Sequence, residues 1–167
     1  MRKLFALFIA TGLMAAVLAA PGTAVARAEF TEYTGVETWL SGGPIFDGVD
    51  FTKPVIQFEV ASVWEDVTTD ARTTGVTTVS GKLTVTDPAT FSGPMHGTSL
   101  TVVTGNGYEG TWEGTWQGKL INGVGFFKAV AHGTGDLAGL KLEAEFTGTE
   151  PGSPVYMEGR ILDPHGN

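Results

Sequence analysis

The segment YEGTWEGTWQGKL, at positions 108–120, alternates glycine with large residues. Trp112 and Trp116 are four residues apart, which is a helical spacing, but three glycines within nine residues strongly disfavour a helix. In a strand, residues two apart share a face. The three glycines and the two tryptophans would then form one face of alternating empty and filled positions. Small closed barrels fill their interiors in this way, with small residues set against large ones.

Two interpretations of this face remain open. In the first, both tryptophans are packed core, and the glycines provide curvature and room for rings from neighbouring strands. In the second, Trp112 or Trp116 walls a ligand cavity, since an eight-stranded barrel is just wide enough to hold one small ligand. The two rings are ~13 Å apart along a strand. They therefore cannot sandwich one small ring, but they can line one cavity at two depths.

The remainder of the chain shows the same two-residue alternation, interrupted by turn signals such as Asn122-Gly123. In the second predicted strand, Ile56, Phe58, Val60, Ser62 and Trp64 share one face, and residues 66–75 after it are predicted to be a polar loop. This pattern predicts an all-β fold, a single eight-stranded antiparallel β-barrel, with a β-sandwich as the alternative. The predicted strands cover residues 34–40, 54–64, 76–86, 95–104, 108–120, 124–132, 137–147 and 155–162.

Positions 1–28 have the organisation of a secretory signal peptide: two basic residues, 17 apolar residues at 4–20, and then Ala-x-Ala sites. We expect cleavage after Ala26 or Ala28 and a barrel domain over 29–167, with an uncleaved N-terminal anchor as the alternative. No other segment is apolar enough to span a bilayer ~30 Å thick. The protein is therefore predicted to be secreted, extracellular or periplasmic, with no stable membrane insertion after cleavage.

The charge of the predicted mature chain limits its partners. From Glu29 onward, seven basic residues face 18 acidic ones, for a net charge of −11. An acidic surface repels phosphate backbones, so nucleic acid is not an expected partner. Cysteine is absent, so an exported domain of this kind depends on its fold rather than on disulfides. The oligomeric state is left open.

A family resemblance adds to this interpretation. The segment YEGTWEGTW, followed by GFFKAVAHGTGDLAGLKLEAEFTG, resembles the C-terminal half of small barrels of the allene-oxide-cyclase-like type. That group includes dirigent-like proteins and bacterial domains of unknown function. The matching feature is the Gly-x-Gly-x-Leu-x-Gly-Leu turn at 133–140, and the resemblance covers about a third of the chain. It implies an eight-stranded barrel with an apolar cavity, but no catalytic residue of the group maps onto this sequence.

The sequence contains no recognisable catalytic motif. His96, His132 and His165 have no metal-ligand spacing, so we expect no metal site and no cofactor. Glu65, Asp66 and Asp70 could bind calcium weakly, but their spacing is not that of an EF-hand, and we expect a solvated loop there.

Acid–base candidates depend on which strand face is inside. We consider Glu113, Glu59 and His132 as candidate catalytic residues, although strand carboxylates usually form a solvated face. If the polar face pointed inward, Glu59 and Glu113 would line the interior together with Lys128 and Arg160. A carboxylate buried there would have a raised pKa and could act as an acid or a base.

Three functions are compatible with the sequence. The first is binding of a small hydrophobic ligand in an apolar cavity lined by Trp112, Trp116, Trp64 and Phe126. The second is a structural or interaction role at the cell surface with a filled core. The third is a cyclase or isomerase of the allene-oxide-cyclase-like type, which would need an ionisable side chain in the cavity.

Overall fold

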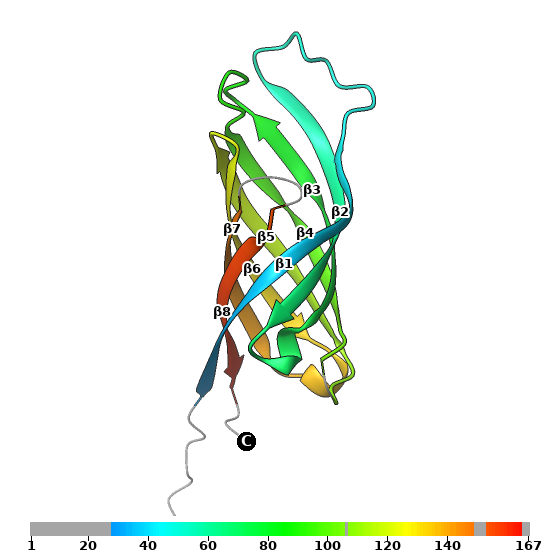
Figure 1. The fold of residues 1–167 in the computed structure, drawn as a ribbon, viewed down its shortest axis with the longest axis vertical. Helices are drawn as coiled ribbons and strands as arrows, with labels where there is room; N and C mark the ends of the chain where they lie inside the picture. Colours follow the sequence, from blue (N-terminus) through cyan, green and yellow to red (C-terminus); the bar gives the residue numbers. More distant parts are fainter. Residues whose placement is uncertain (1–27, 106, 149–152, 165–167) are drawn as a thin grey trace, which may run out of the picture.

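The computed structural model describes residues 28–105, 107–148 and 153–164, which form a closed antiparallel β-barrel (Figure 1). The predicted eight-stranded all-β barrel is confirmed, and the sandwich alternative is not the fold observed. The signal-peptide prediction lies almost entirely outside the described residues. The strands are β1 (Glu29–Ile45), β2 (Ile56–Thr68), β3 (Gly75–Val85), β4 (Gly93–Val103), β5 (Thr111–Ile121), β6 (Val124–Gly133), β7 (Lys141–Gly148) and β8 (Val155–Asp163).

Each strand pairs with the next along the chain, and β1 also pairs with β8. Residues 29–37 of β1 pair with β8, whereas residues 35–45 pair with β2. The pairing with β2 is shifted by a bulge between Trp39 and Ser41. Closure pairs the first strand with the last over residues 29–37 of β1, which protects this edge from edge-to-edge aggregation.

Several predicted strand boundaries were wrong. β1 runs past Leu40 because Gly42 and Gly43 take positive φ angles of 84° and 145° and keep the chain paired with β2. β2 runs past Trp64 to Thr68 because residues 65–68 still pair with β1. Backbone pairing, rather than side-chain hydrophobicity, therefore decides where these strands end. Two other predicted strands begin later than expected. Residues 108–110 precede β5, and residues 137–140 form the end of a 3₁₀ helix and a turn before β7.

The barrel interior contains two packed clusters, one near each end. The upper cluster in Figure 1 consists of Ile56, Phe58, Leu83 and Val85. The ring of Phe58, in this cluster, also contacts the rings of Phe46 and Phe91, with centroid distances of 5.0 and 6.1 Å. The lower cluster consists of Tyr33, Val103, Trp112, Ala131, Leu137, Leu142, Ala144, Met157 and Ile161.

Trp116 lies between the two clusters and packs against glycines of two neighbouring strands. A Cβ placed on Gly97 of β4 would lie 2.8 Å from Trp116 Cε2, and one placed on Gly81 of β3 would lie 2.5 Å from Cζ2. The ring of Phe127 in turn lies against Gly118 and meets Trp116 edge-on, with centroids 5.9 Å apart. On the Gly-Trp face itself, Gly118 provides space for a ring from the adjacent strand, as the first interpretation predicted, whereas Gly114 lies against Ala131.

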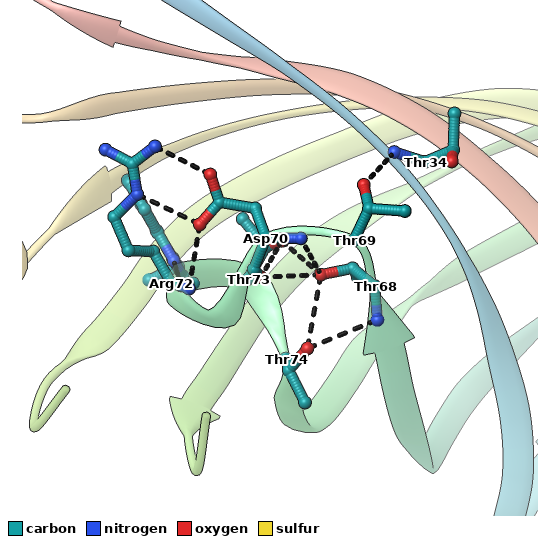
Figure 2. Close-up of polar contacts among 8 residues, drawn as sticks. Thr34, Thr68, Thr69, Asp70, Arg72, Thr73 and Thr74 are labelled. Atoms are coloured by element: carbon teal, nitrogen blue, oxygen red, sulfur yellow. Dashed lines mark hydrogen bonds and ion pairs between the residues drawn. The ribbon is translucent and has the colours of Figure 1, made fainter. Parts of the chain in front are cut away.

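The turn after β2 lies at the lower end of the barrel in Figure 1, and Figure 2 shows its polar contacts. Asp70 caps the 3₁₀ helix η1 (Ala71–Thr73) by accepting hydrogen bonds from the backbone N–H and the guanidinium of Arg72. Thr68 Oγ1 donates to the Asp70 carbonyl at 2.7 Å. Trp112 Nε1 donates to the Arg72 carbonyl at 2.7 Å, which ties η1 to the barrel interior.

We expect Gly97→Ala to destabilise the barrel by ~1–3 kcal/mol, because the added methyl group overpacks a space already bounded by the Ser80 carbonyl oxygen, the Gly81 backbone and the Trp116 indole. Urea denaturation of the purified protein measures this change. The matched control is Thr98→Val, whose side chain is exposed on the same strand and should change stability by less than ~0.5 kcal/mol. Equal stability of the two variants would contradict the close packing around Gly97.

Candidate functional site

A cavity of about 160 Å³ lies inside the barrel between the two clusters. All eight strands contribute to its wall, and η1 contributes Thr73. The wall combines large apolar rings with a polar sector on β1 to β4. The apolar lining includes Trp64, Trp112, Trp116, Phe127 and Phe146, and the polar lining includes Tyr33, Glu37, Ser62, Asp66, Thr73, Thr77, Ser99 and Thr101.

Three of the four predicted ligand-contacting residues line this cavity. Trp112 and Trp116 are 2% and 8% exposed, and Trp64 is partly buried. The indole N–H groups are satisfied within the wall: Trp116 Nε1 donates to the Thr98 carbonyl at 3.1 Å, and Trp64 Nε1 donates to Ser62 Oγ at 2.8 Å. These tryptophans are therefore fixed in orientation and present apolar ring surface to the cavity.

The fourth predicted residue, Phe126, is not in the cavity. It lies on the outer face of β6 and is 42% exposed. Because side chains alternate along a strand, the inner face of β6 carries Phe127, Ala129 and Ala131 instead. The prediction selected the wrong member of the Phe126-Phe127 pair, and Phe127 takes the predicted place.

The three candidate catalytic residues also lie on the outer surface. Glu59, Glu113 and His132 are exposed, because their neighbours in sequence occupy the inner face. The alternative with the polar face inward is therefore wrong. Lys128 and Arg160 are exposed as well and form ion pairs across strands with Glu145 and Glu143. His96 is exposed, and His165 lies outside the described residues.

The cavity contains a pair of carboxyl groups that the sequence analysis did not select. Glu37 of β1 and Asp66 of β2 are directly paired across the two strands, and both line the cavity. Asp66 is 5% exposed. Its Oδ2 accepts a hydrogen bond from Thr77 Oγ1, which is itself 2.6 Å from Thr101 Oγ1 on β4. The expected solvated loop containing Asp66 is thus an interior strand position.

A hydrogen bond between the two carboxyl groups contributes to the pKa shifts of both, raising the pKa of Glu37 and lowering that of Asp66. Such a bond requires that one of them holds a proton. When both are ionised, Oδ1 of Asp66 has no hydrogen-bond donor among the described N–H and O–H groups, although it is buried. The pair therefore shares a proton or leaves a buried oxygen without a donor.

Burial raises the pKa of both acids. Desolvation, followed by repulsion from Asp66, raises the pKa of Glu37 well above its usual range. Desolvation raises the pKa of Asp66 to about 7, although hydrogen bonds from Thr77 and Glu37 oppose the shift. The phenol of Tyr33 has a raised pKa, mainly through burial and also through the charge of Asp66, and stays neutral. The site therefore exchanges a proton near neutral pH.

The sequence contained two signals for this pair that were not used. Asp66 continues the alternation Ile56, Phe58, Val60, Ser62, Trp64, so extending the strand by one inward position would have placed it inside. Glu37 lies four residues from the buried Tyr33 and shares its strand parity. The register that brings Glu37 opposite Asp66 depends on the pairing of β1 with β2, which has no local signature in the sequence.

No group of three or more His, Asp or Glu side chains in the described part of the chain is arranged to hold a metal ion. Over the same residues, no helix has the length and apolar character needed to cross a membrane. A scan against protein-family models finds no match to the chain, and neither does a search of curated proteins.

We expect the protein to lose stability as the pH rises from about 4 to about 7. Unfolded carboxyl groups ionise near pH 4, whereas the folded Asp66 has a pKa of about 7. In this interval the folded state binds more protons than the unfolded state, so the free energy of unfolding falls with rising pH. Urea denaturation at a series of pH values measures the slope.

Glu37→Gln should flatten that slope and make the protein roughly 1–3 kcal/mol more stable than wild type at pH 8. The amide removes one charge and can donate a hydrogen bond to Asp66. Glu113→Gln, which removes an exposed carboxylate, should keep the wild-type slope. An unchanged slope in Glu37→Gln would show that the two carboxyl groups do not share a proton.

Proposed function

We propose that this protein is an exported barrel that binds one small, mainly apolar ligand inside its β-sheet. The observation that carries the proposal is the cavity of about 160 Å³ between two packed clusters. Small-molecule sites are typically concave and mostly apolar, with a few placed polar groups, and this cavity has that composition.

The size of the cavity limits the ligand. An engineered cavity of ~150 Å³ in another protein is large enough to bind benzene. The interior of this barrel therefore suits a ligand with one six-membered ring and a short substituent. Trp116 and Phe127, which meet edge-on, offer ring surfaces for such a guest.

Access to the cavity is expected from the upper end in Figure 1. A hollow among the turns at that end shares Trp64, Phe127 and Val155 with the cavity wall and reaches outward to Phe91. Phe91 is exposed and takes a positive φ of 50° in the turn between β3 and β4. At the opposite end, η1 is hydrogen-bonded to Trp112 through the Arg72 carbonyl, and Leu137 is fully buried.

An enzyme of the cyclase or isomerase type is the second candidate, favoured by one observation. The paired Glu37 and Asp66 supply an ionisable group in the cavity, with a pKa near neutrality for Asp66. General acids and bases are most effective with pKa values near the working pH. A structural role with a filled core is less well supported, because the core contains this cavity.

Binding can be tested with neutral single-ring probes. We expect toluene or benzyl alcohol to change tryptophan fluorescence and to raise the melting temperature, since a ligand at 100 times its Kd stabilises by about 2.7 kcal/mol. Naphthalene should bind more weakly than a single-ring probe, because its second fused ring has less free space in a cavity of about 160 Å³.

Ala129→Leu should abolish the response, because Ala129 lines the cavity and the longer side chain fills it. Its control is Val130→Leu, which changes the adjacent residue on the outer face, where Val130 is 50% exposed, and should bind as wild type does. If no small apolar probe binds the wild type, or if Ala129→Leu binds unchanged, ligand binding in this cavity is wrong.

A further inference from the structure

We propose that the ligand of this barrel is a small organic cation, a single ring bearing an ammonium group that binds between Glu37 and Asp66. The inference rests on the proposed ligand-binding function and specifies the ligand's chemical class. It is carried by the placement of two carboxyl groups and three tryptophans around the same cavity.

The charge of the cavity selects a cation. Among its lining residues, Glu37 and Asp66 are acidic and none is lysine, arginine or histidine. The guanidinium of Arg72, at η1, already pairs with Asp70 at 2.6 Å. A negative charge on the acid pair therefore has no protein cation in the cavity wall to balance it, and a bound anion would be repelled.

The hydrogen bonds around Asp66 favour a ligand that carries a hydrogen-bond donor. Thr77 occupies Oδ2, whereas Oδ1 is buried and accepts from no described N–H or hydroxyl group. A buried carboxylate oxygen without a donor is costly. An ammonium group carries three N–H donors and no acceptor, so it can bridge Oδ1 of Asp66 and the carboxylate of Glu37. A carbonyl or ether ligand offers no donor to either group.

The apolar wall fits the remainder of such a ligand. Trp64, Trp112 and Trp116 line the same cavity as the acids, and a cation near an indole face gains a further electrostatic attraction. The ring can pack against Trp116 and Phe127, while the short substituent reaches β1 and β2. The ammonium therefore replaces the proton that the two carboxyl groups otherwise share.

Competition between the ammonium and this proton makes binding depend on pH. Asp66 releases its proton with a pKa of about 7, so amine affinity should increase between pH 5 and pH 8. The other charged or titratable groups around the pair are Tyr33 on β1, Glu65 on β2, and Asp70 and Arg72 at η1. The cavity-lining neighbours on β3 and β8 are Thr77, Val155 and Met157, which do not titrate.

The experiment compares benzylamine with benzyl alcohol, which share a ring and differ in the charged group. Titration calorimetry at pH 8 should give ~10- to 100-fold tighter binding for benzylamine, the range expected for hydrogen bonds to a charged group. From pH 8 to pH 5 the benzylamine affinity should fall, and the benzyl alcohol affinity should stay the same.

Three variants test whether the preference for benzylamine arises at the acid pair. Glu37→Gln and Asp66→Asn should each remove most of the preference for benzylamine and retain benzyl alcohol binding, which also shows that the variants are folded. Glu113→Gln removes an exposed carboxylate from the outer face and should retain the full preference. It controls for general attraction of a cation to an acidic protein.

The outcomes separate this inference from the proposed function. If benzyl alcohol binds and benzylamine binds no better, the ligand class is wrong and the ligand-binding function stands. If the preference persists in both Glu37→Gln and Asp66→Asn, the acid pair is not the cation site and the inference fails. If neither probe binds the wild type, both the ligand class and the proposed function are overturned.

Discussion

The pairing of β1 with both β2 and β8 is the constraint on which the rest of the structure depends. The two pairings overlap at residues 35–37, so this part of β1 lies between both neighbours. Closure there fixes the register of the whole sheet, because a shift of one residue would reverse every side chain between inside and outside. Glu37 lies at the overlap, opposite Asp66 on one side and Val155 on the other. The same contact that closes the barrel therefore assembles the acid pair.

Aromatic rings in the interior pack over glycines of neighbouring strands. This packing determines where the cavity lies. Trp116 covers Gly97 and Gly81, and Phe127 covers Gly118, so these rings occupy the space that the glycines leave. Larger residues at the glycine positions would push the rings inward, since protein interiors are close-packed and cannot absorb extra volume. Gly81, Gly97 and Gly118 are therefore as important to the cavity as the rings that cover them.

Two-residue alternation was enough to predict the fold class and most of the inner face. It placed Trp64, Trp112 and Trp116 inside, because they lie in strands with clear apolar periodicity. It failed where polar residues continue a strand: Asp66 was assigned to a loop because hydrophobicity ends at Trp64, although backbone pairing continues to Thr68. It also selected Phe126 over Phe127, since two adjacent aromatic residues do not by themselves indicate which one faces the interior. Glu37 and Asp66 are 29 positions apart, and their contact follows only from the register of closure.

The acid pair is a costly feature for a small protein without disulfides. Two carboxyl groups taken out of water repel each other and lose hydration, and once both are ionised one buried oxygen of Asp66 lacks a donor. An apolar or amide pair at the same positions would fit the barrel at lower cost. Strongly shifted acids in a concave site are characteristic of functional positions, where local stability is given up for chemistry or recognition. The energetic penalty of Glu37 and Asp66 is thus itself an argument that the cavity has a guest, because a bound cation would balance the charge and supply the missing donor.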